Sequence, residues 1–251
     1  VEQRSQIGGD DRIPAIARRG DFVYNFWQDA GNPRGLWRRT TLAEYRKSAP
    51  AWELLLDVDA LGRSEGENWV WAGAVCLGPD YTRCLVKLSR GGADAQVVRE
   101  FDTATRQFVA GGFNLPEAKS EVAWLDRDTV FVGTDFGPGS LTDSGYPRLI
   151  KRWQRGQPLA DAVTVFEAQH SDVAASVHVD ATPGFERTLL QRAPDFFSSF
   201  VPTFDVRMMT VLRKSTRWPQ LSVSRPSSKI CSSRLKTSGW AFSISSSSTT
   251  E

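Results

Sequence analysis

Short strands joined by tight turns recur about every 50 residues in this chain, and no other feature of the sequence constrains the fold as strongly. The first strand of each unit is predicted to begin near residues 22, 70, 121 and 173. Loops within a unit are too short for crossovers, so neighbouring strands must be antiparallel. Such repeats are typical of propeller blades. The sequence therefore predicts an all-β fold, an incomplete β-propeller of about four four-stranded antiparallel blades; a β-sandwich is the alternative.

The second unit shows the pattern most completely. Its strands are predicted at residues 69–74, 83–89, 95–102 and 107–109, with Gly, Pro and Asp in the turns between them. Strands of the other units are predicted at residues 22–27, 35–40, 121–125, 129–134, 148–155, 162–167, 173–179 and 187–193. Only residues 42–47 and 60–65 are predicted to be helical, as short connectors.

Composition divides the chain into a lead-in at residues 1–20, a partial propeller at residues 21–199 and a tail at residues 200–251. Residues 1–199 carry 27 acidic and 23 basic side chains, whereas the tail carries 2 and 8. The tail is rich in Ser and Arg, which predicts disorder. Its basic residues do not cluster with aromatic ones, so no nucleic acid is expected as a partner. A Ser-rich linker is one interpretation of the tail, and out-of-frame translation is the favoured one. The codons of Met208, Met209 and Thr210, read from the third base of each Met codon, encode the Asp-Asp of a turn.

Three cysteines give no metal-ligand spacing. Cys76 and Cys84 bracket a predicted turn and could face each other across a hairpin, but buried free thiols are the expectation for them and for Cys231. No apolar run is long enough for a transmembrane helix, so no membrane partner is expected. The chain begins VEQRSQIGGDD, without Met, and we expect a fragment. A cytoplasmic location is predicted, with a periplasmic one left open.

Three segments carry a resemblance to a known family: DFVYNFWQDAGNPRGLWRRTTLAEY from residue 21, GENWVWAGAVCLGPDYTRCLVKLSRGGADAQVVREFD from residue 66, and PEAKSEVAWLDRDTVFVGTDFGPGSLTDSGYPR from residue 116. Over residues 21–199 the chain resembles the amino-terminal β-propeller domain of the prolyl oligopeptidase family of serine peptidases, in its bacterial branch. The resemblance implies a two-domain enzyme that cleaves short peptides, typically after proline. An α/β-hydrolase domain would carry its Ser, Asp and His, and the propeller would restrict access to small substrates.

The catalytic residues of that family are not predicted in this chain. A nucleophile elbow needs GxSxG at a strand-to-helix turn, and the nearest string, GPGSL at residues 137–141, lacks the second glycine around Ser140. His178 alternates within VHVD and is predicted to be a half-exposed strand residue, and His170 has no triad partners. We therefore assign no catalytic, cofactor-binding or metal-binding residue and no cofactor, and we predict that the chain alone is inactive.

Two pairs of carboxylates offer other chemistry. Asp57 with Asp59, and Asp126 with Asp128, have the composition of glycosidase or calcium sites. Both pairs fall at strand ends, where Asp commonly bonds its own backbone, so turn formation is the prediction.

Aromatic and basic residues of the first unit suggest packing roles. Trp27 and Trp37 are expected to pack one blade against the next. Arg34, Arg38 and Arg39 could line a channel, or the arginines beside Trp37 could stack on its ring.

The resemblance thus implies the gating, substrate-filtering propeller part of a serine peptidase that hydrolyses short, proline-containing peptides. Its expected partners are those peptides, through the intact enzyme, and the missing α/β-hydrolase domain. A stand-alone propeller that binds other proteins is the alternative, and a small sugar-binding propeller is a third possibility. Four blades alone leave open sheet edges, so we expect poor solubility or aggregation.

Overall fold

The computed structural model describes residues 15–200 and 203–204. The chain divides into two units, Val1–Thr210 and Val211–Glu251, and only the first contains described residues. Most of the predicted tail therefore lies outside the described residues, and with it the predicted disorder, the reading-frame interpretation and Cys231.

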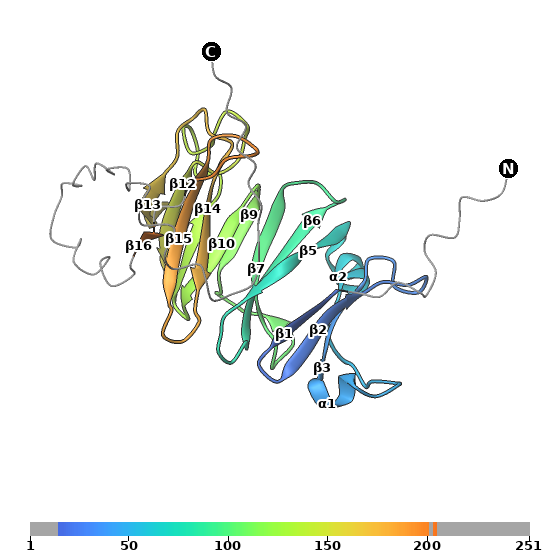
Figure 1. Cartoon of the computed structure of the whole chain (residues 1–251). Helices are drawn as coiled ribbons and strands as arrows, with labels where there is room; N and C mark the ends of the chain where they lie inside the picture. The colour runs from blue at the N-terminus through green and yellow to red at the C-terminus, as the bar shows by residue number, and fades with distance from the viewer. Residues whose placement is uncertain (1–14, 201–202, 205–251) are drawn as a thin grey trace, which may run out of the picture. The chain divides into compact units, whose positions relative to one another are not determined.

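Four antiparallel sheets, here called blades 1 to 4, follow one another along the described residues (Figure 1). Blade 1 consists of β1 (Ile16–Arg19), β2 (Phe22–Trp27), β3 (Leu36–Thr41) and β4 (Glu53–Asp57). Blade 2 consists of β5 (Trp69–Cys76), β6 (Arg83–Arg90), β7 (Gln96–Asp102), β8 (Gln107–Phe108) and β9 (Asn114–Ala118), the last two both pairing with β7. Blade 3 consists of β10 (Glu121–Asp126), β11 (Thr129–Gly133), β12 (Leu149–Gln154) and β13 (Val163–Glu167). Blade 4 consists of β14 (Ala174–Asp180), β15 (Arg187–Ala193) and β16 (Thr203–Phe204). The helical segments are α1 (Leu42–Tyr45), α2 (Val58–Glu65) and the 3-10 turn η1 (Leu159–Asp161).

These sheets confirm the predicted fold, an incomplete β-propeller of four antiparallel blades. Four strands were not predicted from the sequence. β1 lies within the residues that were predicted to form a lead-in, β4 completes blade 1, and β9 extends the edge of blade 2. β16 lies within the predicted disordered tail and pairs with β15, so the expectation of disorder was wrong for these two residues. Both predicted helical connectors are present, as α1 and α2.

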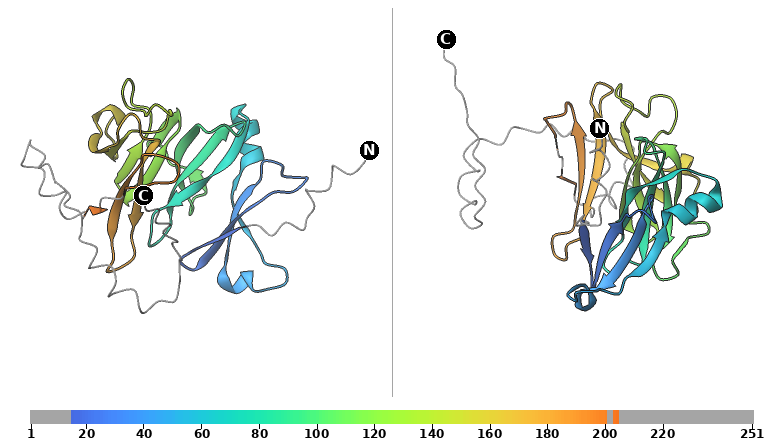
Figure 2. Two further views of the ribbon diagram at one scale, coloured as in Figure 1. Left: turned by 45° about the horizontal axis from the view of Figure 1, so that its top comes forward. Right: turned by 90° about the vertical axis from the view of Figure 1, so that its right-hand side faces the viewer.

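Successive blades pack face to face, because neighbouring residues of a strand point to opposite sides of its sheet. On β6, Val86 and Leu88 pack against blade 1, whereas Leu85 packs against blade 3. On β10, Trp124 faces blade 2 and Ala123 faces blade 4. Blades 2 and 3 are therefore buried on both faces, which fixes their register. Figure 2 shows the succession of blades from two further directions.

The turn between β2 and β3 is organised by Asp29. Its carboxylate accepts hydrogen bonds from Trp27 Nε1 at 2.7 Å and from the backbone N–H groups of Gly31 and Asn32 at 2.9 and 2.8 Å. The bond from the Trp27 indole is the main reason why the pKa of Asp29 lies below its usual value. A short polar side chain that bonds the backbone two and three residues ahead is what this turn requires.

The two tryptophans of this hairpin have different roles. Trp37 packs blade 1 against blade 2, as predicted: its ring centroid lies 5.1 Å from that of Trp71 and 5.6 Å from that of Phe101. The prediction for Trp27 was wrong, because the hydrogen bond and ring contact that it makes with described residues lie within blade 1. Its indole bonds Asp29, and its ring lies 4.6 Å from the guanidinium of Arg38.

Cys76 and Cys84 form a disulfide, so the expectation of free thiols was wrong for this pair. They are direct cross-strand partners on β5 and β6, and side chains at such positions lie on the same face of the sheet. Cys84 is fully buried. The bond closes the hairpin whose loop spans residues 77–82.

Candidate functional site

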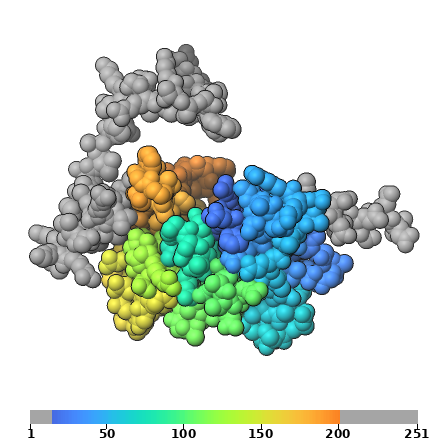
Figure 3. Space-filling model, turned by 90° about the horizontal axis from the view of Figure 1, so that it is seen from below, coloured from blue at the N-terminus to red at the C-terminus, as the bar shows by residue number. Residues whose placement is uncertain are grey.

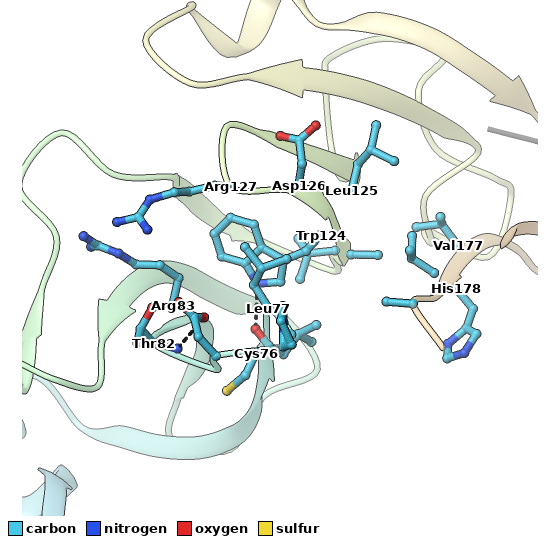
Figure 4. Close-up of a pocket in the computed structure, with 18 of the residues that line it drawn as sticks. Cys76, Leu77, Thr82, Arg83, Trp124, Leu125, Asp126, Arg127, Val177 and His178 are labelled. Carbon is cyan, nitrogen blue, oxygen red and sulfur yellow. Dashed lines mark hydrogen bonds between the residues drawn. The ribbon is translucent and has the colours of Figure 1, made fainter. Parts of the chain in front are cut away.

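The first strands of blades 2, 3 and 4 lie beside one another, since β10 contacts both β5 and β14. A cavity of about 610 Å³, here called the central cavity, runs along them. It is lined by residues of these three strands, of β6 and of the turns that follow the three strands. Figure 4 shows the side chains around it. Its volume lies within the roughly 300–1,000 Å³ that is typical of ligand pockets.

The turns that follow the first strands gather at one end of this cavity. Figure 3 looks onto that end, where the β5–β6, β10–β11 and β14–β15 turns appear in teal, light green and orange. Asp80, Arg127 and Ala181, one from each turn, line the cavity. Its mouth is thus built from turns, which carry binding residues more often than strands do.

Trp124 of β10 forms the middle of the cavity wall (Figure 4). Its indole Nε1 donates a hydrogen bond of 2.9 Å to the carbonyl oxygen of Val75 on β5. Its ring meets that of Phe113 edge to face, with centroids 5.7 Å apart. The indole is therefore held in one orientation between blades 2 and 3, and it offers the cavity a rigid apolar surface.

A network of charges joins blades 2 and 3 beside this wall. The carboxylate of Glu100, whose side chain is 1% exposed, accepts hydrogen bonds from Arg155 Nη1 and Nη2 at 2.8 and 3.0 Å and from the backbone N–H of Phe113 at 2.9 Å. Arg83, which lines the cavity, lies 3.9 Å from Glu100 and 3.2 Å from Asp102. A buried carboxylate needs such partners to remain charged.

Charged side chains stand at both ends of β10. Glu121 begins the strand and lines the cavity, and burial raises the pKa of its carboxyl group, against the opposing effect of the Lys87 ammonium group. Arg127 lies just past the other end of the strand. At ~3.3 Å per residue the two ends are about 20 Å apart, which gives the cavity an elongated, polar-ended form.

Ser140 lies in a buried hydrogen-bond network within its own loop. Its hydroxyl donates to the carbonyl oxygen of Gly137 at 2.6 Å and accepts from the backbone N–H of Phe136 at 2.9 Å. His170 lies in the same region and is exposed. His178 is an exposed residue of β14, and it is the one described histidine that lines the central cavity.

The carboxylates of Asp57 and Asp59 both accept hydrogen bonds from backbone N–H groups. Asp57 accepts a hydrogen bond of 2.8 Å from the backbone N–H of Ala60 and caps the start of α2. Asp59 accepts from the backbone N–H of Gly35 at 3.1 Å and so ties the β2–β3 turn to α2. The predicted turn role is confirmed for Asp57, and Asp59 holds a turn that is distant in the sequence.

The pair Asp126 and Asp128 is divided between two tasks. Asp126 accepts a hydrogen bond of 2.8 Å from the backbone N–H of Asp128, which confirms the predicted turn role. Asp128 forms a 2.9 Å ion pair with Arg155 and so extends the network that joins blades 2 and 3. Within residues 15–200 and 203–204 no group of three or more His, Cys, Asp or Glu side chains is placed to hold a metal ion.

Arg38 lies outside the central cavity and binds aromatic rings of blade 1. Its guanidinium lies 4.6 Å from the ring centroids of both Trp27 and Trp52. It does not stack on Trp37, because consecutive residues of β3 point to opposite faces.

Arg34 and Arg39 do not line the central cavity either. Arg39 pairs with Glu53 at 2.7 Å and lies 4.4 Å from the ring centroid of Phe22. The predicted stacking on Trp37 was therefore wrong, since the ring of Trp37 is occupied by aromatic residues of blade 2.

Sequence reasoning missed three residues of the cavity: Glu121, Trp124 and Arg127. The signal that could have found them is their position on or just after the first strand of a unit, because the first strands of successive units lie together in a propeller. Within the described part of the chain, no helix has both the length and the apolar content needed to cross a membrane.

Comparison with known proteins agrees with this architecture. Residues 5–183 match the family model described as the prolyl oligopeptidase N-terminal beta-propeller domain. An uncharacterized peptidase of Sinorhizobium fredii, y4nA, is 46% identical over 193 residues, which cover 75% of this chain and 26% of that protein. A peptidase of Rickettsia prowazekii is 34% identical over 169 residues, which cover 64% of this chain and 23% of that protein.

Solved structures give the same result. A post-proline cleaving enzyme from Rickettsia typhi matches with a TM-score of 0.72 and 29% identity, over 79% of this chain and 30% of that one. Oligopeptidase B from Leishmania major, at 15% identity and a TM-score of 0.61 over 77% of this chain and 26% of that one, shares the fold.

Antiparallel blades that pack face to face, with a ligand-sized cavity along the first strands of blades 2, 3 and 4, define a β-propeller domain. This chain belongs to the prolyl oligopeptidase N-terminal β-propeller family. It spans about a quarter of the length of the curated relatives that it matches.

Proposed function

We propose that this chain is the substrate-filtering propeller part of a serine peptidase that hydrolyses short, proline-containing peptides. The propeller would admit peptides that fit between its blades and exclude folded proteins. Hydrolysis would take place in an α/β-hydrolase domain, which is the proposed partner of the chain.

One observation carries this proposal: the central cavity lies on the first strands of a propeller that belongs to a peptidase family. Its wall contains an immobilised indole and apolar side chains, and its mouth carries charged groups, a combination that suits a short peptide. The share of the relatives that the chain spans leaves room in them for a further domain.

The proposal is tested first by reading the DNA downstream of this locus in all frames. A hydrolase frame with GxSxG is expected. The product of the complete locus is then assayed on a proline-containing peptide and on the same peptide with alanine in place of proline. We expect cleavage after proline that is lost when the serine of that motif is replaced by alanine. A clean stop followed by unrelated genes would favour a protein-interaction module instead.

A further inference from the structure

Arg127 is a cation at the mouth of the cavity. Among the described residues its guanidinium makes no ion pair or hydrogen bond, although its backbone carbonyl accepts a hydrogen bond from Arg155. Its side chain is exposed. In Figure 4 the guanidinium groups of Arg127 and Arg83 extend to the same end of the cavity, past the ring of Trp124.

The other charges at this end are already used. Arg83 is paired with Asp102, and Asp80 bonds the backbone N–H and hydroxyl of Thr82 through its two oxygens, at 3.1 and 3.0 Å. Asp126 accepts a hydrogen bond within its own turn. Within the described part of the chain, Arg127 is thus the group at this end that is free to bind a ligand anion.

The wall beside Arg127 is apolar. Leu77 of the β5–β6 loop, Trp124 of β10 and Val177 of β14 all line the same cavity. An anion that carries an apolar substituent would place its charge at Arg127 and its substituent against Trp124 and Leu77. A doubly charged phosphate group fits less well, because it would meet the carboxylates of Asp80 and Asp126 at the same mouth.

We propose that this end of the cavity binds the free C-terminal carboxylate of a short peptide, with Arg127 as its anchor and Trp124 in contact with the last side chain. The site rests on the proposed function in that its ligand belongs to the substrate class proposed above. Arginine binds carboxylates through paired N–H donors, which makes it suited to recognise a chain end. In a peptide held by its C-terminus, the position of each residue would be set by the number of residues that separate it from Arg127.

The site is tested by measuring the affinity of the whole 251-residue chain for a fluorescein-labelled Gly-Leu-Pro-Ala-Leu peptide by anisotropy, as the free acid and as the C-terminal amide. We expect the free acid to bind about tenfold more tightly, the size of effect that a charge-assisted hydrogen bond produces. Arg127→Gln should reduce the ratio of the two dissociation constants to about one. Arg127→Lys should retain part of it.

Arg63→Gln is the matched control, since Arg63 is another exposed arginine, on α2 and away from this cavity. It should leave the ratio unchanged, while circular dichroism verifies the fold of every variant. The proposal is overturned by equal affinity of acid and amide, by binding of neither, or by a ratio that survives Arg127→Gln. Acid preference that depends on Arg127 without any proline-specific hydrolysis by the complete product would leave this site standing and remove the proposed function. Proline-specific hydrolysis by the complete product without a preference for the free acid would leave the proposed function standing and remove this site.

Discussion

Arg155 of blade 3 holds Glu100 of blade 2 through two hydrogen bonds, Nη1 to Oε2 at 2.8 Å and Nη2 to Oε1 at 3.0 Å. The carboxylate is buried, whereas the arginine is partly exposed. Each blade has its own backbone ladder, so the placement of blade 3 against blade 2 depends on contacts that side chains make, among them this pair and the bond from the Trp124 indole to the Val75 carbonyl oxygen. This pair joins the two blades next to the cavity wall, and it therefore bears on both stability and the shape of the site.

Replacing Arg155 with methionine should lower the free energy of unfolding by about 2–3 kcal/mol, because it leaves the Glu100 charge buried with fewer partners. Urea unfolding followed by tryptophan fluorescence measures the change. The double variant Glu100→Gln with Arg155→Met should recover a large part of the loss, since no buried charge remains. Equal losses in the single and double variants would contradict this account.

Gly35 should not tolerate a side chain. Its φ is +96°, and a Cβ there would overlap Cζ of Phe26, so Gly35→Ala combines backbone strain with a steric clash. Gly111→Ala is the matched control, because its φ is +67° and nothing lies within 4 Å of the added Cβ. We expect the control to cost about 1–2 kcal/mol and Gly35→Ala clearly more. Similar melting temperatures for the two variants would show that the Phe26 ring does not exclude a Cβ at residue 35.

The disulfide should be detectable by counting thiols. The chain has three cysteines, so the denatured, unreduced protein should expose one reactive thiol and the reduced protein three. Reduction should lower stability by about 2–3 kcal/mol, the entropy of closing a loop of this size. A Cys76→Ser, Cys84→Ser variant should not respond to reductant. Three thiols before reduction would exclude the bond. Since disulfides persist in oxidising compartments, the count also bears on the predicted cytoplasmic location.

Stability should depend on pH through Glu121. Its pKa is raised in the folded state, so the folded protein binds the proton more tightly than the unfolded chain. The resulting stabilisation is present below the unfolded pKa and is lost as the pH rises through the folded pKa. Glu121→Gln should therefore gain stability relative to the parent protein between pH 4 and pH 7.

Glu67→Gln provides the opposite case for that experiment, because the hydrogen bond from Arg90 lowers the pKa of Glu67. This variant should lose stability relative to the parent protein over the same pH range. Urea unfolding of the parent protein and of the two variants at pH 4 and pH 7 measures how the free energy of unfolding of each variant differs from that of the parent. Differences of the same sign would contradict the assignment of burial as the cause at Glu121.

Strands with alternating side chains and clear turns could be predicted from the sequence. The first strands of blades 2, 3 and 4 begin at residues 69, 121 and 174, where the units were expected, whereas the strand at residue 22 is the second strand of blade 1, after β1. β4 was missed because ELLLD is a continuous apolar run, which does not distinguish a strand from a helix. β9 was missed because Pro116 interrupts it, and a proline in a strand is acceptable only at an edge.

The cavity could not be predicted in the same way. Trp124 and Leu77 meet there only because β5 and β10 are adjacent, and that adjacency depends on packing between blades rather than on local sequence. The role of Trp27 was misjudged for a similar reason. Its ring is held by the turn residue Asp29, and a hydrogen bond between side chains leaves no periodic signal.

Discrimination by substrate length tests the central claim most directly. The product of the complete locus is assayed on a proline-containing peptide of about five residues and on one of about 30 residues with the same cleavage sequence, and kcat/KM is compared. We predict a preference of about 100-fold or more for the short peptide, which Arg155→Met reduces by loosening the contact between blades 2 and 3. Equal kcat/KM for the two peptides in the parent protein would contradict a filtering role for this propeller.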